Sequence, residues 1–256
     1  MSLVGDIDTV RGVVLDIEGT TTPVSFVYDV LFPYARERLG RFLASHQDGD
    51  TIRDALELLQ SEWLADTEAQ ADAGHLVSHP ERSEGSALPA PPPFDSSYAS
   101  QYLEWLMDRD RKSTALKIIQ GEIWRGGFES GVLRGDVYAD VRPALERWRA
   151  AGRLIAIYSS GSAAAQRLLF GHSTRGDLTP FINAYIDTNI GHKRSTDSYT
   201  AIARALEIHT NALLFISDVD AELVAARDAG FQTRLCVRGD AAPPSTSKII
   251  CSFDEL

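Results

Sequence analysis

The sequence predicts an α/β protein with a doubly wound, mainly parallel sheet and an inserted all-helical cap domain. Two observations lead to this fold class. Short apolar segments alternate with helical segments along the second half of the chain, which is typical of sheets with helices on both faces. A long helical block separates the first apolar segment from the others, and an inserted domain is the simplest account of that order.

Five apolar segments have the length and composition of buried strands. Each is rich in Val, Ile, Leu or aromatic residues and is bounded by turn or helix signals. Because the segments are continuous rather than alternating, we expect both faces of the sheet to be covered. The expected strands are Gly12 to Leu15, Leu154 to Tyr158, Phe181 to Ile186, Ala212 to Ile216 and Thr233 to Val237.

Three helices are expected between the later strands. The segment from Asp140 to Gly152 has an acidic N-cap candidate, a proline near its first turn and a closing glycine. Ser195 to Leu206 places apolar residues on one face, and Ala221 to Ala229 is followed by Gly230. The alternation of helix and strand that results predicts a doubly wound domain.

Residues 26–128 form the helical block, with apolar residues at helical spacing, about four expected helices and no strand signal. We therefore predict an α/β core from residues 1–25 and 129–256 and a helical cap from residues 26–128. Within the cap, the stretch of about 65–94 is rich in proline, alanine and serine, and this composition predicts a loop.

Charge and composition argue against several classes of function. Lys plus Arg number 25 and Asp plus Glu 36, a net charge of −11, which disfavours nucleic acid and anionic membranes as partners. No apolar run approaches the ~18 residues of a membrane span, and residues 1–12 lack the pattern of a signal peptide. Two cysteines, Cys236 and Cys251, are too few for a disulfide framework, so we expect a cytoplasmic protein.

The first candidate site motif is DIEGTT at residues 16–21, directly after the first strand. Ligands of parallel α/β sheets bind beyond the carboxyl ends of the strands. The carboxylates of Asp16 and Glu18, two residues apart on an extended segment, point the same way. An acidic turn that merely ends a strand is the alternative.

The second and third motifs supply groups that suit a phosphate. Ser159 and Ser160 lie between a strand and a helix in YSSGS, and small hydroxyl residues with glycine at a helix N-terminus form a phosphate cradle. A plain helix cap is the alternative for them. Lys193 follows the third strand and is a surface lysine unless it neutralises a phosphate at an acidic site.

The fourth motif, SDVDAE at residues 217–222, has three acids after the fourth strand. Asp218, Asp220 and Glu222 suggest a site for a hard cation such as Mg²⁺, although acids also favour helix N-termini. The ends of parallel strands meet at one edge of the sheet, so we expect the four motifs to form one site. An acidic chain then admits an anionic substrate through local cations.

The order of these motifs resembles the haloacid dehalogenase superfamily of aspartate-nucleophile phosphatases. Within it, DIEGTTTPVSFVYDVLFPYAR, YSSGS followed by AQRLLFGHS, and SDVDAEL resemble the enolase-phosphatase (acireductone synthase) family of methionine salvage, a branch of amino-acid biosynthesis. Most phosphatases of the superfamily have Asp where this chain has Glu18. The resemblance covers nearly the whole chain apart from residues 65–94.

The resemblance implies a nucleophile and a metal site. Asp16 is the implied nucleophile, which takes the phosphoryl group. One Mg²⁺ per chain is implied, held by the Asp16 carboxylate, the backbone carbonyl of Glu18 and the side chain of Asp218. Glu222 matches an acid of the family that stands four residues after the metal ligand Asp218 and supports the ligands without binding the metal itself.

The resemblance also implies how substrate binds. Ser159 and Ser160 would bind the phosphate, and Lys193 would neutralise it and orient Asp16. The implied substrate is 2,3-diketo-5-methylthiopentyl 1-phosphate, which is enolised and then dephosphorylated to the acireductone. Glu18 is our hypothesis for a proton-transfer group in enolisation, because its extra methylene gives a reach that Asp lacks.

Other functions and some details stay open at this stage. The chain could be a superfamily phosphatase of another small phosphate ester, a dehalogenase, or a phosphate-ligand binder without catalysis. The resemblance suggests a monomer. The methylthio tail could contact four aromatic residues that could equally be cap core, namely Phe26, Tyr28, Phe32 and Trp124.

Overall fold

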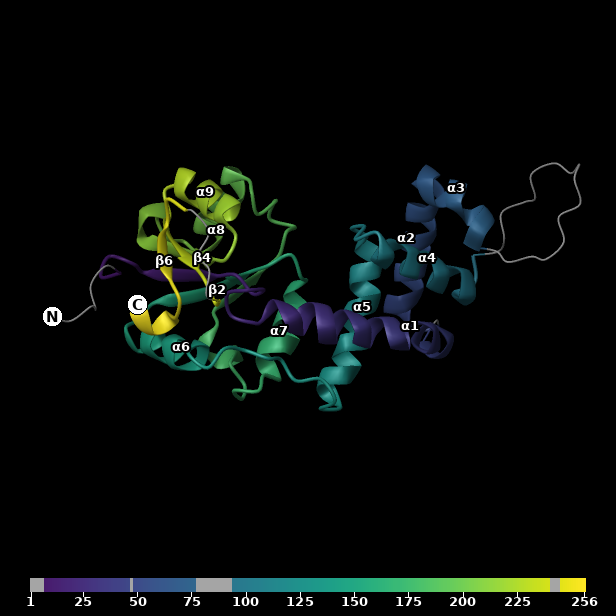
Figure 1. Ribbon diagram of the computed structural model, residues 1–256, viewed down its shortest axis with the longest axis horizontal. Coiled ribbons are helices and arrows are strands. Elements are labelled where there is room, and N and C mark those ends of the chain that lie inside the picture. The colour runs from purple at the N-terminus through teal and green to yellow at the C-terminus, as the bar shows by residue number, and fades with distance from the viewer. Residues whose placement is uncertain (1–6, 47, 77–93, 240–244) are drawn as a thin grey trace, which may run out of the picture. The chain divides into compact units, whose positions relative to one another are not determined.

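The structure, a computed structural model, describes residues 7–46, 48–76, 94–239 and 245–256 (Figure 1). The chain divides into two compact units, Met1–Leu31 with Arg125–Leu256 and Phe32–Trp124. These boundaries lie a few residues away from 26–128, the range assigned to the cap from the sequence. In the described residues, no helix is long and apolar enough to cross a membrane.

The first unit is built on a six-stranded sheet in the order β3-β2-β1-β4-β5-β6, and every neighbouring pair is parallel. The predicted doubly wound α/β fold with a helical insertion is thereby confirmed. The strands of the first unit are β1 (Gly12–Leu15), β2 (Leu154–Tyr158), β3 (Ala184–Ile186), β4 (Leu213–Ser217), β5 (Gln232–Cys236) and β6 (Lys248–Ile250).

Two strands differ from the sequence prediction. The segment expected from Phe181 to Ile186 starts as a 3₁₀ turn, η2 (Thr179–Phe181), because Pro180 at its start favours a turn, and only its last three residues pair. The strand β6 was missed because three residues with an exposed Lys248 carry too little apolar pattern.

Helices cover both faces of this sheet. Figure 1 shows α8 and α9 on one side of the strands and α6 and α7 on the other. On the first side, Tyr199, Ile202 and Leu223 pack with Val14 and Phe215 of the sheet. The helices are α6 (Val141–Ala150), α7 (Ala163–Gly171), α8 (Thr196–Ala205) and α9 (Asp220–Asp228), followed at the end of the chain by the 3₁₀ turn η4 (Phe253–Glu255).

The second unit is helical, with a core of aliphatic and aromatic side chains. A π-helical turn, η1 (Phe26–Leu31), precedes it. Leu39, Leu59 and Leu103 are fully buried in that core, and each such side chain contributes about 1.5–3 kcal/mol. Within its described residues the helices are α1 (Phe32–His46), α2 (Asp50–Ala65), α3 (Thr67–Leu76), α4 (Ser96–Asp108) and α5 (Thr114–Glu129), and the sequence suggested about four. The last of these continues past Trp124 into the first unit.

The extra helix corrects part of the loop predicted for residues 65–94. Residues 67–76 form α3 because the alanines, Glu68 and Gln70 favour a helix, and Asp66 accepts a hydrogen bond from the Ala69 amide at 3.1 Å as a cap. The remainder of the predicted loop, 77–93, lies outside the described residues.

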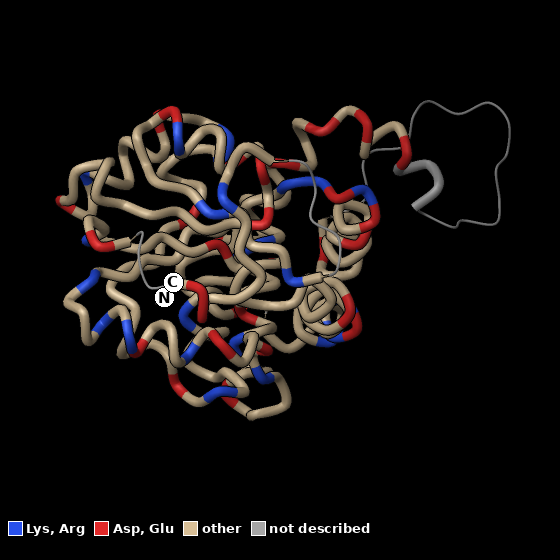
Figure 2. Tube along the Cα trace, turned by 60° about the vertical axis from the view of Figure 1, so that its left-hand side comes forward, with Lys and Arg blue, Asp and Glu red and all other residues tan. Residues whose placement is uncertain are grey.

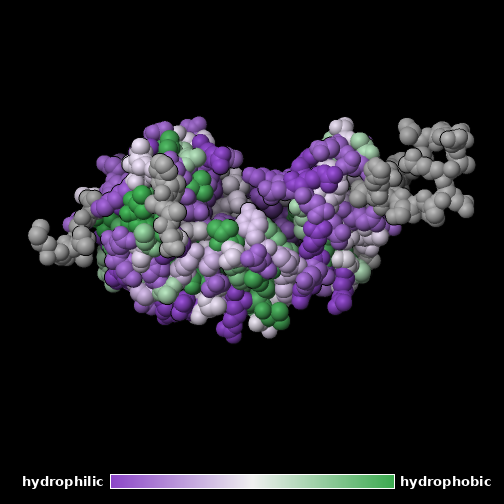
Figure 3. All heavy atoms as spheres, in the orientation of Figure 1, coloured by the Kyte–Doolittle hydropathy of each residue, from purple (hydrophilic) through white to green (hydrophobic). Residues whose placement is uncertain are grey.

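Charged and apolar residues share the surfaces of both units. Figure 2 shows acidic and basic residues interspersed along each unit, and Figure 3 shows mostly hydrophilic residues with small apolar patches on the visible face. Arg36 pairs with Asp108 at 2.6 Å, which joins α1 to the end of α4. Single exposed apolar side chains, such as Val132 at 66%, are ordinary on a protein surface.

Candidate active site

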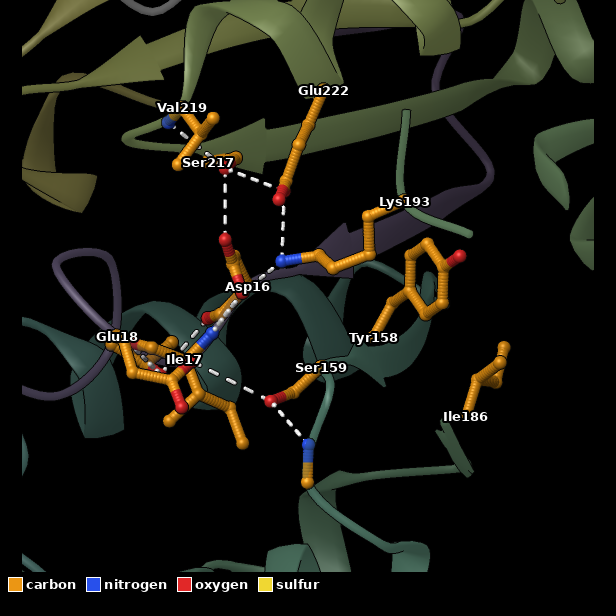
Figure 4. A network of polar contacts seen from close by, with 12 residues as sticks. Asp16, Ile17, Glu18, Tyr158, Ser159, Ile186, Lys193, Ser217, Val219 and Glu222 are labelled. Atoms are coloured by element: carbon orange, nitrogen blue, oxygen red, sulfur yellow. Dashed lines mark hydrogen bonds and ion pairs between the residues drawn. The ribbon is translucent and has the colours of Figure 1, made fainter. Parts of the chain in front are cut away.

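The four candidate motifs follow four neighbouring strands. Strand β1 lies between β2 and β4, and β3 lies beyond β2, so their carboxyl ends share one edge. Figure 4 shows that Asp16, Ser159, Lys193 and Glu222 converge there. The structure therefore brings together side chains that lie up to about two hundred residues apart in the sequence.

Asp16 is the centre of this edge and is almost fully buried. Its Oδ1 accepts a hydrogen bond from the Ile17 amide at 2.8 Å and lies 2.6 Å from Lys193 Nζ. Its Oδ2 accepts a hydrogen bond from Ser217 Oγ at 2.8 Å. The carboxylate is thus held from both sides in one orientation, with a fixed positive charge beside it.

Lys193 bridges two carboxylates. Its Nζ lies 2.6 Å from Asp16 Oδ1 and 2.7 Å from Glu222 Oε2, and its side chain is 12% exposed. Burial by itself would lower the pKa of Lys193, but the two carboxylates raise it, so the amine stays charged. Tyr199 Oη donates to the Lys193 carbonyl at 2.7 Å, which fixes the backbone from which the lysine extends.

Ser217 and Glu222 complete the buried network. Ser217 Oγ lies 2.8 Å from Asp16 Oδ2 and 3.2 Å from Glu222 Oε2, so its one proton is donated to either carboxylate in turn. Burial, together with the charge of Asp16, raises the pKa of Glu222 to about 7. Sequence reasoning gave Ser217 no role, although a small hydroxyl residue at a strand end beside an acid is a usable signal.

Asp218 lies against the turn that carries the first motif. Gly19 has a φ of +69°, and a Cβ there would clash with the Asp218 carboxylate. Only glycine suits this position, because it adopts the conformation without strain and leaves room for the acid. Burial and the neighbouring Asp16 raise the pKa of Asp218 to about 6, which marks a surplus of negative charge.

This surplus fits a divalent cation. Among the described residues no three His, Cys, Asp or Glu side chains form a cluster arranged for a metal. Mg²⁺ needs fewer, because it commonly binds one or two carboxylates and completes its shell with waters and phosphate oxygens. Asp16 and Asp218 are carboxylates of the type that such a site uses, and the turn at residues 16–19 carries backbone carbonyls.

Glu18 and Ser159 face each other across the site. Ser159 Oγ donates to Glu18 Oε2 at 3.5 Å and accepts from the Gly161 amide at 3.2 Å. Burial, with the charge of Asp16, raises the pKa of Glu18. Gln166 supports this loop by donating to the Gly161 and Ile186 carbonyls at 2.8 and 2.9 Å. In the sequence it stands beside Arg167 on a helix whose other residues are apolar or glycine, which gives only a weak signal.

The remaining candidates lie in different surroundings. Ser160 is exposed directly after Ser159. Phe26 is buried, Tyr28 is 60% exposed, and the rings of Phe32 and Trp124 lie 6.1 Å apart. Trp124 packs against the helical core, so at least this aromatic residue has a structural role.

Comparison with known proteins places this site in a family. The model of the haloacid dehalogenase-like hydrolases matches residues 10–230. A relative from Synechococcus elongatus, named Enolase-phosphatase E1, is 47% identical over 97% of this chain and 98% of its own. This chain belongs to the enolase-phosphatase family of haloacid dehalogenase-like hydrolases.

Other members and solved structures agree with this assignment. The Enolase-phosphatase E1 of Drosophila mojavensis is 43% identical over 90% of this chain and 86% of its own. The UTR4 protein of Saccharomyces cerevisiae matches with a TM-score of 0.73 and 28% identity, over 96% of this chain and 100% of that one. CbbY of Rhodobacter sphaeroides, at 14% identity and a TM-score of 0.52 over 96% of both chains, shares the fold alone.

The edge of the sheet in this enolase-phosphatase family member has the groups that phosphoryl transfer requires. Such transfer depends mainly on positioning and on stabilisation of negative charge. Asp16 is a buried carboxylate with fixed hydrogen bonds, Lys193 is a fixed cation, and Ser159 is a hydroxyl donor on the next strand end. A phosphate ester is therefore the class of ligand that this arrangement suits.

Proposed function

We propose that this chain is a Mg²⁺-dependent enolase-phosphatase of methionine salvage, which enolises 2,3-diketo-5-methylthiopentyl 1-phosphate and then dephosphorylates the enol to the acireductone. One observation carries the proposal: the buried Asp16 carboxylate lies 2.6 Å from the Lys193 ammonium at the edge where the other motifs also end. The 47% identity to an Enolase-phosphatase E1 supports the choice of substrate.

In the phosphatase step, we assign the attack on phosphorus to the Asp16 carboxylate. A bond forms between a carboxylate oxygen and phosphorus as the bond from phosphorus to the ester oxygen on C1 breaks, and that oxygen takes a proton from water as the acireductone leaves. Water then attacks the aspartyl phosphate, which releases inorganic phosphate and restores the Asp16 carboxylate. Lys193 offsets the repulsion between the carboxylate and the phosphate dianion. Ser159 and Ser160 are assigned to bind the phosphate oxygens, and Glu222 to hold Lys193 in place.

The metal ligands in this proposal are the side chains of Asp16 and Asp218 and the backbone carbonyl of Glu18. When bound, Mg²⁺ supplies positive charge to the phosphoryl and ketone oxygens as a Lewis acid. The raised pKa of Asp218 supports this site, because a cation would relieve the repulsion between the two carboxylates.

In the enolase step, we assign proton transfer to Glu18. Its carboxylate takes a proton from the carbon that bears the phosphate ester, the electron pair of that bond forms the C=C bond, and the ketone oxygen receives the negative charge. The same proton can then be returned to that oxygen. The raised pKa of Glu18 supports this role, since a general base works best when its pKa approaches the working pH.

The decisive experiment follows diketone absorbance and phosphate release separately, with and without Mg²⁺, in the wild type and in Asp16→Asn. We expect both signals from the wild type with Mg²⁺, and phosphate release slower by about 10⁴-fold or more in the variant, because the amide is a poor nucleophile. Equal phosphate release by the two proteins would exclude the aspartyl-phosphate route.

Glu18→Gln tests the enolase step by itself. The substitution removes the base but keeps the backbone carbonyl, so we expect enolisation to slow by about 10²- to 10⁴-fold while the preformed enol still loses phosphate. Glu129→Gln, an exposed carboxyl on α5, is the matched control. Wild-type rates for both steps in Glu18→Gln would remove Glu18 from the mechanism.

Two further properties follow from the family resemblance and from the cysteine content, respectively. We propose that the protein is a monomer and is cytoplasmic, where its two unpaired cysteines stay reduced. Light scattering of the purified chain and fractionation of expressing cells test the two statements.

A further inference from the structure

Arg238, two residues after β5, contacts the turn that carries the first site motif. Its Nε and Nη2 both donate to the Thr20 carbonyl, at 3.0 and 2.8 Å. Its Nη1 donates to Asp140 Oδ2 at 2.7 Å and to the Cys251 carbonyl at 3.4 Å. One guanidinium thus joins the 16–22 turn to the start of α6 and to the residues just before η4.

The surroundings of Arg238 hold it in this position. Its side chain is 9% exposed and that of Asp140 is 10% exposed. The guanidinium carbon lies 4.3 Å from the ring centroid of Tyr138 and 4.6 Å from that of Phe253. A planar guanidinium between two rings, with its donors already directed, loses little further freedom when it binds the turn.

Asp140 is itself fixed by η4. Its Oδ2 accepts hydrogen bonds from the Phe253 amide at 2.6 Å and from Ser252 Oγ at 3.1 Å, in addition to the one from Arg238. The carboxylate therefore connects η4 to the arginine, and through the arginine to Thr20.

The turn needs such a restraint because of Gly19. The amides of Thr20, Thr21 and Thr22 all converge on the Ile17 carbonyl, at 2.9 to 3.2 Å, while the Thr20 carbonyl points to Arg238. Glycine has more accessible backbone conformations than any other residue, so its neighbours must select one. The two donors of Arg238 on the Thr20 carbonyl, one residue after Gly19, restrain that choice together with the hydrogen bond from the Gly19 amide to the Thr22 carbonyl at 2.8 Å.

We propose that Arg238 is a positioning residue for the reaction, which holds the 16–22 turn in its working conformation through the Thr20 carbonyl, with Asp140 and η4 as its anchor. The effect on rate rests on the proposed function. The effect on the turn does not, so the two are measured separately.

The experiment compares Arg238→Ala and Arg238→Lys with Arg147→Ala. Arg147 donates to the Phe253 and Leu256 carbonyls at 2.8 and 3.2 Å and its side chain is 43% exposed, so its substitution removes an arginine beside η4 but leaves the Asp140 contacts with Ser252 and Phe253 and the Arg238 contacts with Thr20 in place. Four quantities are measured: amide hydrogen exchange across residues 17–25, Mg²⁺ affinity by calorimetry, kcat and KM on the diketone phosphate, and Tm.

We expect Arg238→Ala to speed amide exchange in the turn, to weaken Mg²⁺ binding, and to lower kcat by about 10- to 100-fold with a smaller change in KM. Arg238→Lys should recover only part of each effect, because an ammonium cannot place two donors on one carbonyl and a third on Asp140. Arg147→Ala should match the wild type in exchange of the turn and in kcat.

Wild-type exchange in the turn for Arg238→Ala would overturn the proposal, and so would a lowered Tm with kcat per folded molecule unchanged. Full recovery by Arg238→Lys would show that charge alone suffices and would overturn the positioning role. If Arg238→Ala does not fold, Asp140→Asn and Arg238→Lys decide by the same criteria. A wild type without activity on the diketone phosphate would refute the proposed function and leave the exchange result intact.

Discussion

The ion pairs of Lys193 in the α/β unit are buried more deeply than those of Arg36 and Arg109 in the helical unit. In the α/β unit, the side chains of Asp16, Lys193 and Glu222 are 3%, 12% and 11% exposed, and they form one buried network. In the helical unit, the ion pairs made by Arg36 and Arg109 have arginine side chains that are 46% and 40% exposed. The residue types are similar, but the charged side chains are shielded from water in the first case and exposed to it in the second.

This difference in exposure to water changes what each ion pair contributes to the stability of the fold. An exposed ion pair stabilises the fold by only about 0–1 kcal/mol, because water already stabilises both charges in the unfolded chain. Removing a buried ion pair from water costs roughly several kcal/mol, which is about as much as the attraction between the two charges returns. Stability of the fold therefore gives no reason by itself to keep such a pair. The buried charges around Asp16 at the strand edge therefore suit a ligand site, whereas the exposed pairs of Arg36 and Arg109 accompany a core made of apolar side chains.

Among the variants that compare the two units, the largest effect should come from Lys193→Met. The substitution leaves Asp16 and Glu222 buried without their cation, so we expect kcat for phosphate release to fall by about 10²- to 10³-fold. Unfolding in denaturant without Mg²⁺ should show a loss of about 3–5 kcal/mol. Lys112→Met, at an exposed position of the helical unit, should leave both quantities close to wild type.

The helical core should respond next, through packing rather than charge. Leu103 is fully buried on α4, so Leu103→Ala should lower the free energy of unfolding by about 2–5 kcal/mol, the sum of lost burial and a cavity. Leu64→Ala, at a side chain that is 60% exposed, is its control and should change stability by less than about 0.5 kcal/mol. Similar losses for both variants would contradict the assignment of this core.

Asp140→Asn should have an intermediate and pH-dependent effect. Burial raises the pKa of Asp140, but hydrogen bonds from Arg238 and the Phe253 amide outweigh it and hold the pKa below its ordinary value. A lowered pKa means that the stabilisation is present above the ordinary pKa of about 4 and is lost as pH falls through the folded-state pKa.

We therefore expect Asp140→Asn to be less stable than the wild type by about 1–3 kcal/mol at pH 7, with the gap closing below pH of about 4. Thermal melts of both proteins between neutral and acidic pH measure it. A gap that stays constant with pH would show that the charge of Asp140 is not what stabilises η4.

The smallest effect should come from the exposed pair of Arg36 and Asp108. A double-mutant cycle with Arg36→Ala and Asp108→Ala should give a coupling energy below about 1 kcal/mol, and added salt should reduce it further. A coupling of several kcal/mol would remove the contrast between the two units.

Much of the site was visible in the sequence because it lies at strand ends. The apolar strand before Asp16 and the one before Ser159 are local patterns, and the acids, serines and lysine after them are types that phosphate chemistry uses. Ser217 and Gln166 were not found, because an uncharged polar residue has many explanations until its hydrogen-bond partners are known. Arg238 was missed for the same reason, since its partners lie at Thr20 and Asp140.

The sequence by itself determined the fold class, the helical insertion and the residue types at the strand ends, because periodicity and local composition are properties of neighbours in the chain. Only the tertiary structure decided the strand order β3-β2-β1-β4-β5-β6, and with it the contact of Lys193 with both Asp16 and Glu222. The pKa changes of Glu222 and Asp218 were also decided there. Desolvation and Coulomb interactions depend on distances through space, and these exist only once the strands are aligned.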